Sequence, residues 1–238
     1  MPPEDCLRRA TNADSSLARA KYATCGLAHP GTDRTLRAML LRQLYLSHME
    51  GERFEEAVEV ARAACGLAVL SDVACQDLAR AYLGAGEVGR AVQELRRASR
   101  LAPASRRSFH LWTLGGVLFF QRDFEQAARV FERAFRWGTT ARPLYRAQLE
   151  LARLELGTES ADLLQLRDHL QAAACGQGYG RFVLGELALR LGDPASAEQY
   201  FAEFVEKSES GRTALRVGLR SELTRARAAL RRLAEDGE

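Results

Sequence analysis

Histidine and glycine are the residue types whose spacing here could indicate catalysis or phosphate binding. The four histidines, at positions 29, 48, 110 and 169, are scattered, and none has a partner at the interval of an HExxH zinc site. The segment Gly176–Gly180 is rich in glycine, but it joins two expected helices instead of following a strand, as a phosphate-binding loop would. We therefore predict no catalytic residue, no metal site and no cofactor, and an enzyme is the class that the sequence supports least.

The cysteines are the next candidates for chemistry. Five of them, at positions 6, 25, 65, 75 and 175, give an odd number with no CxxC pair, which favours buried structural thiols over a metal or redox site. The tetrapeptide Cys25–Ala28 recurs as Cys65–Ala68. We expect Gly26 and Gly66 to end their helices in the left-handed conformation, so the recurrence indicates internal repetition before it indicates chemistry.

Arginine supplies nearly all of the positive charge, because Lys21 and Lys207 are the only lysines. The net charge of +3 gives no general electrostatic case for binding nucleic acid. Arg129, Arg133 and Arg136 lie at helical spacing and form either a solvated stripe or a phosphate-binding one. Seven more arginines lie between positions 212 and 232, on a helix that either caps the domain or binds an anionic surface.

The chain of 238 residues is long enough for one extended domain, and its 47% hydrophobic and 27% charged residues are typical of soluble proteins. The first five residues are acidic and are not followed by the apolar segment of a signal peptide. No run of about 18 apolar residues is present, as a membrane-spanning helix would require. We therefore expect a cytoplasmic protein without a membrane span.

Apolar residues recur at helical spacing from about residue 37 to residue 207. This spacing predicts pairs of helices joined by short turns. The clearest pairs are 72–102 and 108–137, and the units start about every 33–37 residues. A pair of this kind cannot bury its apolar face alone, so it must stack on further copies. No segment has the alternation of a strand, so we predict one continuous all-helical domain.

Several helix ends can be predicted from capping residues. We expect Ser71 to cap a helix, Pro143 to lie in a first turn, and Asp193 to cap the helix that begins at Pro194. We also expect a helix over about 160–174 and one long C-terminal helix over about 211–234.

The repeated pairs resemble tetratricopeptide repeats, which are stacked helix–turn–helix units of about 34 residues. Small residues at the closest approach of the two helices carry this resemblance: Ala79, Gly115, Ala152 and Gly185 in the first helices, and Ala57, Ala91, Ala127 and Ala197 in the second. Phe54 and Phe124 match the aromatic residue of the turn, and Pro103 matches the closing proline.

The resemblance implies an all-α, right-handed α-solenoid of about five repeats, with an N-terminal half-repeat and a C-terminal capping helix. The expected divisions are 1–36 for the half-repeat, 37–207 for the repeats and 209–238 for the cap and tail. Within the repeat domain the units are expected at about 37–70, 71–106, 107–141, 142–176 and 177–208.

The resemblance also implies that a peptide or a partner helix binds in a concave groove lined by the first helix of each repeat. The groove positions that we assign to partner binding are Arg42, Leu46, Gln76, Arg80, Trp112, Gly116, Phe119, Leu149, Arg153, Phe182 and Glu186. Apolar anchors would contact Trp112 and Phe119, and acidic groups would meet Arg80 and Arg153. The alternative is that the aromatic side chains only pack between adjacent repeats.

We therefore expect a non-enzymatic adaptor or scaffold for a protein or peptide partner with apolar and acidic groups. Two alternatives remain open. One is a nucleic-acid-associated or regulatory module that uses the arginine-rich surfaces, whose affinity would fall steeply with salt. The other is a self-associating solenoid, whose mass in solution would rise with concentration.

Overall fold

The computed structural model describes residues 1–158, 162–211 and 213–236. Within these ranges the chain forms helices and turns and no strand, as the helical spacing predicts. None of the described helices is long and apolar enough to cross a membrane. The contacts group the chain into two compact units, Met1–Ala102 and Pro103–Glu238.

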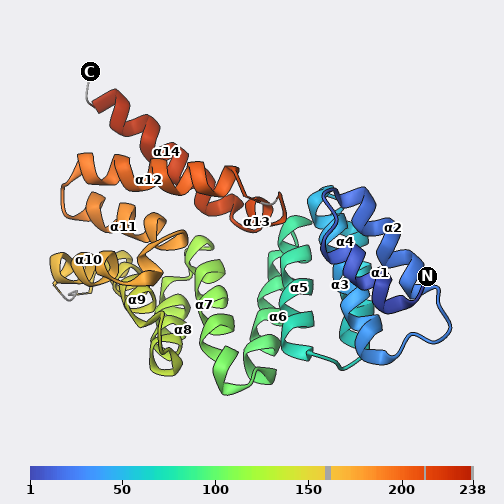
Figure 1. Ribbon diagram of the computed structural model, residues 1–238. Coiled ribbons are helices and arrows are strands. Elements are labelled where there is room, and N and C mark those ends of the chain that lie inside the picture. Colours follow the sequence, from blue (N-terminus) through green and yellow to red (C-terminus); the bar gives the residue numbers. More distant parts are fainter. Residues whose placement is uncertain (159–161, 212, 237–238) are drawn as a thin grey trace. The chain divides into compact units, whose positions relative to one another are not determined.

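The first unit consists of successive antiparallel helices (Figure 1). They are α1 (Pro3–Thr11), α2 (Ser16–Leu27), α3 (Arg34–Glu50), α4 (Phe54–Gly66), α5 (Ser71–Gly84) and α6 (Val88–Leu101). Each helix packs on the next in sequence, and α3 also contacts α1 and α5. The helices α1, α3 and α5 therefore form one layer, which we call the inner face of the first unit.

The second unit continues the pattern. Its helices are α7 (Ala104–Phe120), α8 (Phe124–Trp137), α9 (Arg142–Glu155), α10 (Leu163–Ala172), α11 (Tyr179–Arg190), α12 (Pro194–Glu209), α13 (Thr213–Gly218) and α14 (Arg220–Asp236), with a short 3₁₀ turn at Ala174–Gly176. Helices α9 and α11 contact each other, and side chains of α7 reach both, so these three form the inner face of the second unit. The predicted helix over 160–174 is present as α10, although residues 159–161 lie outside the described residues.

Small residues lie where the paired helices approach most closely, as predicted. Gly115 and Gly185 face the rings of Phe131 and Phe201, and a Cβ atom on either glycine would lie 2.6 or 2.7 Å from the ring. The matching alanines Ala57, Ala79, Ala91, Ala127, Ala152 and Ala197 are fully buried. The backbones can approach because no larger side chain separates them.

The turns between paired helices share one backbone conformation. A residue in the left-handed region occurs at Glu52, Gly86, Arg122, Gly157 and Gly192, which are about 35 residues apart. In each turn the next N–H donates to a carbonyl five residues earlier, for example from Asp123 to Leu118 at 3.0 Å. This is the Schellman ending of a helix, and its recurrence is direct structural support for five equivalent repeats.

Four predictions about helix ends are wrong. Gly26 lies inside α2, where its lack of a side chain lets Leu40 approach, and the left-handed residue after α4 is Ala68 instead of Gly66. Ser71 is the first residue of α5, and its side chain does not cap the helix. The third repeat starts at Ala104, directly after Pro103, and not near Ser108.

The predicted starts of two other helices are confirmed. Pro143 lies in the first turn of α9, and the Asp193 side chain accepts a hydrogen bond from the Ser196 N–H at 3.1 Å. The C-terminal segment differs, because the expected single helix is divided into α13 and α14 at Leu219. Arg212, the first of the seven C-terminal arginines, lies outside the described residues.

Candidate binding surfaces

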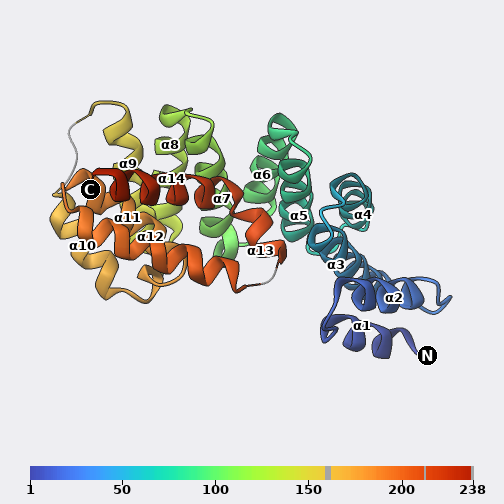
Figure 2. The same ribbon diagram turned by 90° about the horizontal axis from the view of Figure 1, so that it is seen from above.

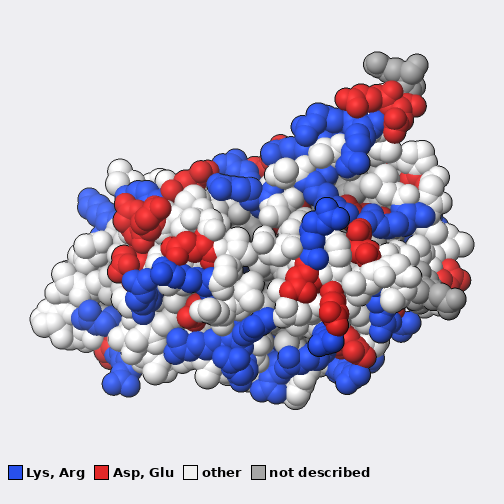
Figure 3. All heavy atoms as spheres, turned by 180° about the vertical axis from the view of Figure 1, so that it is seen from behind, with Lys and Arg blue, Asp and Glu red and all other residues white. Residues whose placement is uncertain are grey.

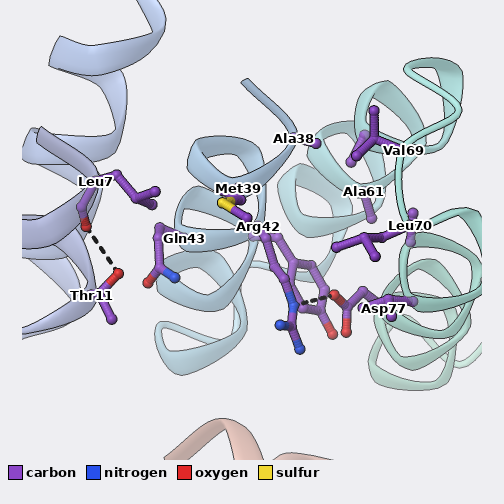
Figure 4. A pocket seen from close by; sticks show the side chains of 14 residues that line it. Leu7, Thr11, Ala38, Met39, Arg42, Gln43, Ala61, Val69, Leu70 and Asp77 are labelled. Atoms are coloured by element: carbon purple, nitrogen blue, oxygen red, sulfur yellow. Dashed lines mark hydrogen bonds and ion pairs between the residues drawn. The ribbon is translucent and has the colours of Figure 1, made fainter. Parts of the chain in front are cut away.

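An apolar pocket of about 260 Å³ opens on the inner face of the first unit (Figure 4). Side chains from α1, α3, α4, α5 and the loop between α4 and α5 line it. Its wall is mostly aliphatic, with Leu7, Met39 and Leu70 among the lining residues, and Arg42 and Asp77 form a polar edge. A pocket of this size and composition suits one or two apolar side chains of a partner.

Two predicted groove residues, Arg42 and Arg80, meet at this edge on the same carboxylate. The Asp77 side chain is only 7% exposed, and it accepts from the Arg42 Nε at 2.9 Å, with Arg80 Nη1 at 3.8 Å. The arginine side chains themselves remain 50% and 37% exposed. Asp77 therefore positions two arginines that still face solvent, where a carboxylate of a partner could reach them.

The Tyr45 ring lies under the same edge. Burial, followed by the negative charge of Asp77, raises the pKa of the Tyr45 phenol, so this group stays neutral at any physiological pH. Of the other predicted groove residues in this unit, Leu46 is half-buried and Gln76 is fully buried, with only 2% of its surface exposed.

The loop that carries Leu70 over the pocket is strained. Ala68 and Leu70 both have positive φ angles, at 54° and 47°, although neither is a glycine. Leu70 nevertheless keeps 47% of its surface exposed at the pocket. Left-handed backbone at a bulky residue is costly and concentrates at functional positions, which makes this loop part of the candidate site.

In the second unit the predicted anchor Trp112 belongs to a chain of hydrogen bonds. Its indole N–H donates to the Gln148 carbonyl oxygen, the Gln148 amide donates to the Tyr179 hydroxyl at 3.3 Å, and that hydroxyl donates to Glu222 of α14 at 3.2 Å. The Trp112 ring also lies edge-on to Tyr179, with centroids 4.8 Å apart. This series of hydrogen bonds therefore connects α7, α9, α11 and α14.

The aromatic residues beside Trp112 pack together across the inner face. Phe182 is 3% exposed and contacts the rings of Phe120, Tyr179 and Phe204. Gly116 leaves open space, because a Cβ atom built there would have no neighbour within 4 Å. This cluster supports packing between adjacent repeats for Phe182, whereas a free space beside α7 remains at Gly116.

Arg225 of α14 covers two further groove positions, Phe119 and Glu186. Its guanidinium lies 5.4 Å from the centre of the Phe119 ring, and it donates to both Glu186 oxygens, at 2.8 and 2.6 Å. Arg190 holds the same carboxylate at 2.9 Å and pairs with Glu155 at 2.6 Å. The sequence did not identify this network, although Glu222, Leu223, Arg225 and Ala226 share helical spacing on α14.

The last two predicted positions, Leu149 and Arg153, line a shallow hollow of about 320 Å³ between α8 and α9. Leu149 is buried, and Arg153 pairs at 2.9 Å with Glu150, which is itself buried. Arg129, from the predicted basic stripe, lines the same hollow and pairs with Glu125 at 2.6 Å. Among the described residues, Arg153 therefore lies with the hollow between α8 and α9 and makes its ion pair there.

Acidic and basic side chains are interspersed on the face shown in Figure 3, and the end of α14 beside the grey residues carries both signs. In the predicted stripe, Arg136 also pairs with a glutamate of its own helix, Glu132, at 2.7 Å. Among the described residues no group of three or more His, Cys, Asp or Glu side chains is arranged to hold a metal ion. Cys6 and Cys75 are buried, whereas Cys25 is exposed.

Comparison with known proteins gives a structural match only. No family model matches the sequence, and no curated protein matches it. A tetratricopeptide repeat protein from Parabacteroides merdae superimposes with a TM-score of 0.61 at 15% identity, covering 99% of this chain and 93% of that one. The pilF protein of Pseudomonas aeruginosa gives a TM-score of 0.55 at 20% identity, covering 85% and 91%.

These likenesses agree with the buried small residues and the recurring Schellman turns within each unit. The chain has the fold of the tetratricopeptide-repeat proteins, an all-helical array of stacked helical pairs.

Proposed function

We propose that this protein is a non-enzymatic scaffold that binds a segment of a partner protein at the pocket of the first unit. An apolar side chain of the partner enters the pocket beside Met39 and Leu70, and an acidic group next to it meets Arg42 and Arg80. The observation that carries this proposal is the combination of an apolar pocket with two solvent-facing arginines on one buried aspartate.

The fold supports the general role, because stacked helical pairs present extended surfaces to other proteins. The cysteines are free thiols, which agrees with the reducing cytoplasm as the location that we propose. The earlier assignments of Leu46, Gln76, Leu149, Arg153 and Phe182 to partner contact stay predictions. Burial of Gln76 and Phe182 gives them, in addition, a packing role.

Pull-down from native lysate with the full chain is the first test, followed by calorimetry with the partner segment that it identifies. Arg42→Glu should weaken binding at least tenfold, about 1.4 kcal/mol, because it places a negative charge where the acidic group binds. Gln43→Trp should weaken binding similarly, since Gln43 lines the pocket and a larger side chain would fill it.

The control is Arg136→Glu, the same charge change on an exposed side chain in the second unit. It should bind as the wild type does. Equal partner binding by wild type, Arg42→Glu and Gln43→Trp, with unchanged circular dichroism and melting temperature, would contradict the proposal. A partner whose affinity falls steeply with salt and is lost in nuclease-treated lysate would instead indicate nucleic acid.

A further inference from the structure

Helix α14 lies across the inner face of the second unit (Figure 2). Its Arg225 reaches three helices of that face, with Phe119 on α7, Glu155 on α9 and Glu186 on α11. Glu222, one turn earlier, accepts from Tyr179 of α11. A segment of the chain itself therefore occupies the positions that a partner helix would contact on this face.

The Glu186 carboxylate on this face is also held by a residue outside α14. The Glu186 side chain is 2% exposed and is held by Arg190 of its own helix, which also pairs with Glu155. Without Arg225, these two carboxylates would share one arginine. Arg190 thus holds both carboxylates from within the face, beside the place that the Arg225 guanidinium occupies over the Phe119 ring.

Helix α14 packs along α12, and only a few of its side chains are fully buried. Its buried side chains are Leu223, Ala226 and Ala229, and two of these are alanines, which bury little apolar area. The short helix α13 precedes it, and a turn at Leu219 separates the two helices. Arg225 and Glu222 are therefore the polar contacts that tie α14 to the inner face, whereas Arg227 pairs with Glu209 of α12.

We propose that this face is a binding site for a cationic amphipathic helix of another protein, and that α14 is its built-in competitor. The incoming helix would place an arginine on Glu186 and Glu155, stacked on the Phe119 ring. On either side of this arginine, apolar residues would take the places of Leu223 and Ala226. The site is distinct from the pocket of the first unit, so the two proposals stand independently.

The test uses a fluorescent synthetic peptide of residues 220–236 as the probe and the full chain as the receptor. In the wild type, tethered α14 competes at a high effective concentration, and peptide binding should be weak. Ala226→Asp places a charge at a buried position and should release α14, so the peptide should bind at least tenfold more tightly. Arg225→Ala releases α14 by a second route and should act in the same direction.

Adding Glu186→Gln to either released variant should weaken peptide binding at least tenfold, because the anchor for the guanidinium is lost. A peptide with Arg225→Ala should bind more weakly by a similar factor. The matched control is Arg231→Asp in the full chain, an exposed position on the same helix, which should leave peptide binding at the wild-type level.

The proposal is overturned if both released variants keep their helical content and melting transition but bind the peptide no better than the wild type. It is also overturned if Glu186→Gln has no effect on binding. A concentration-dependent dimer of the released variants that excludes the peptide would overturn it in favour of a second copy of the chain as the occupant.

Discussion

Gly115 and Gly116 are neighbours on α7 with opposite surroundings. A Cβ atom on Gly115 would lie 2.6 Å from the Phe131 ring, whereas one on Gly116 would meet nothing within 4 Å. Gly115→Ala should therefore lower the free energy of unfolding by about 1–3 kcal/mol, since it overpacks the closest approach of two helices. Gly116→Ala should be neutral or raise it by up to about 1 kcal/mol, because alanine favours helix.

Urea denaturation of both variants measures this difference. The matched change from glycine to alanine at adjacent positions controls for the effect of alanine itself. If Gly115→Ala were as stable as Gly116→Ala, the close packing inferred from the repeated small residues would be wrong.

Whether Trp112 contacts a partner or packs in the core could not be decided from its residue type alone. Its position on the inner face follows from helical spacing, but its partners Gln148 and Tyr179 lie on α9 and α11. A tryptophan with a hydrogen-bonded indole N–H and an edge-on ring contributes to the packing between repeats. The sequence left open whether it is an anchor or core, and these contacts support the core role.

Among the elements, α14 is the one whose docking should depend on pH. Burial raises the pKa of the Glu222 carboxyl to about 7, from its ordinary 4.5, when the helix is docked. The Tyr179 hydroxyl donates to Glu222. One turn along α14, Arg225 pairs with Glu186 and Glu155, which Arg190 also holds. The neutral carboxyl is favoured in the docked state, so docking is stabilised fully below pH 4.5 and loses this contribution as pH rises through 7.

The loss amounts to at most about 3 kcal/mol. Hydrogen exchange of the α14 amides, corrected for intrinsic rates, should therefore show less protection at pH 8 than at pH 5.5. Glu222→Gln should remove most of this dependence, whereas Glu235→Gln at the exposed end of the helix should preserve it. The same protection at both pH values in the wild type would contradict the expectation.

The helical pairs were predictable because their determinants are local. Small residues, turn residues and apolar spacing all recur within about 35 residues, and each repeat carries its own copy. The sequence predicted a C-terminal capping helix, and α14 packs on α12 of the last repeat. Its contact between Arg225 and Glu186 was not predictable, because the two are 39 residues apart and no periodic pattern links them. The pocket was missed for the same reason, since its wall combines residues from four helices and a strained loop.

At the scale of the whole molecule, each of the two units contains its own core. Leu40 and Leu95 are fully buried in the first, and Phe131 and Phe201 in the second. We expect fragments 1–102 and 103–238 each to be helical and to unfold cooperatively, because repeat arrays are stabilised mainly by contacts between neighbouring helices. Circular dichroism during thermal unfolding measures this, with the intact chain as the control. A fragment without helical signal would show that its unit depends on the other.

The shared backbone of the repeat turns has one practical consequence. Glu52 in the first unit and Arg122 in the second are exposed, equivalent tip positions that tolerate an ordinary side chain at positive φ, and neither lines the two proposed surfaces. A pair of dyes attached there would act as a spectroscopic ruler between the units. The distance in solution, and its change when a partner binds, would then be measurable without disturbing recognition.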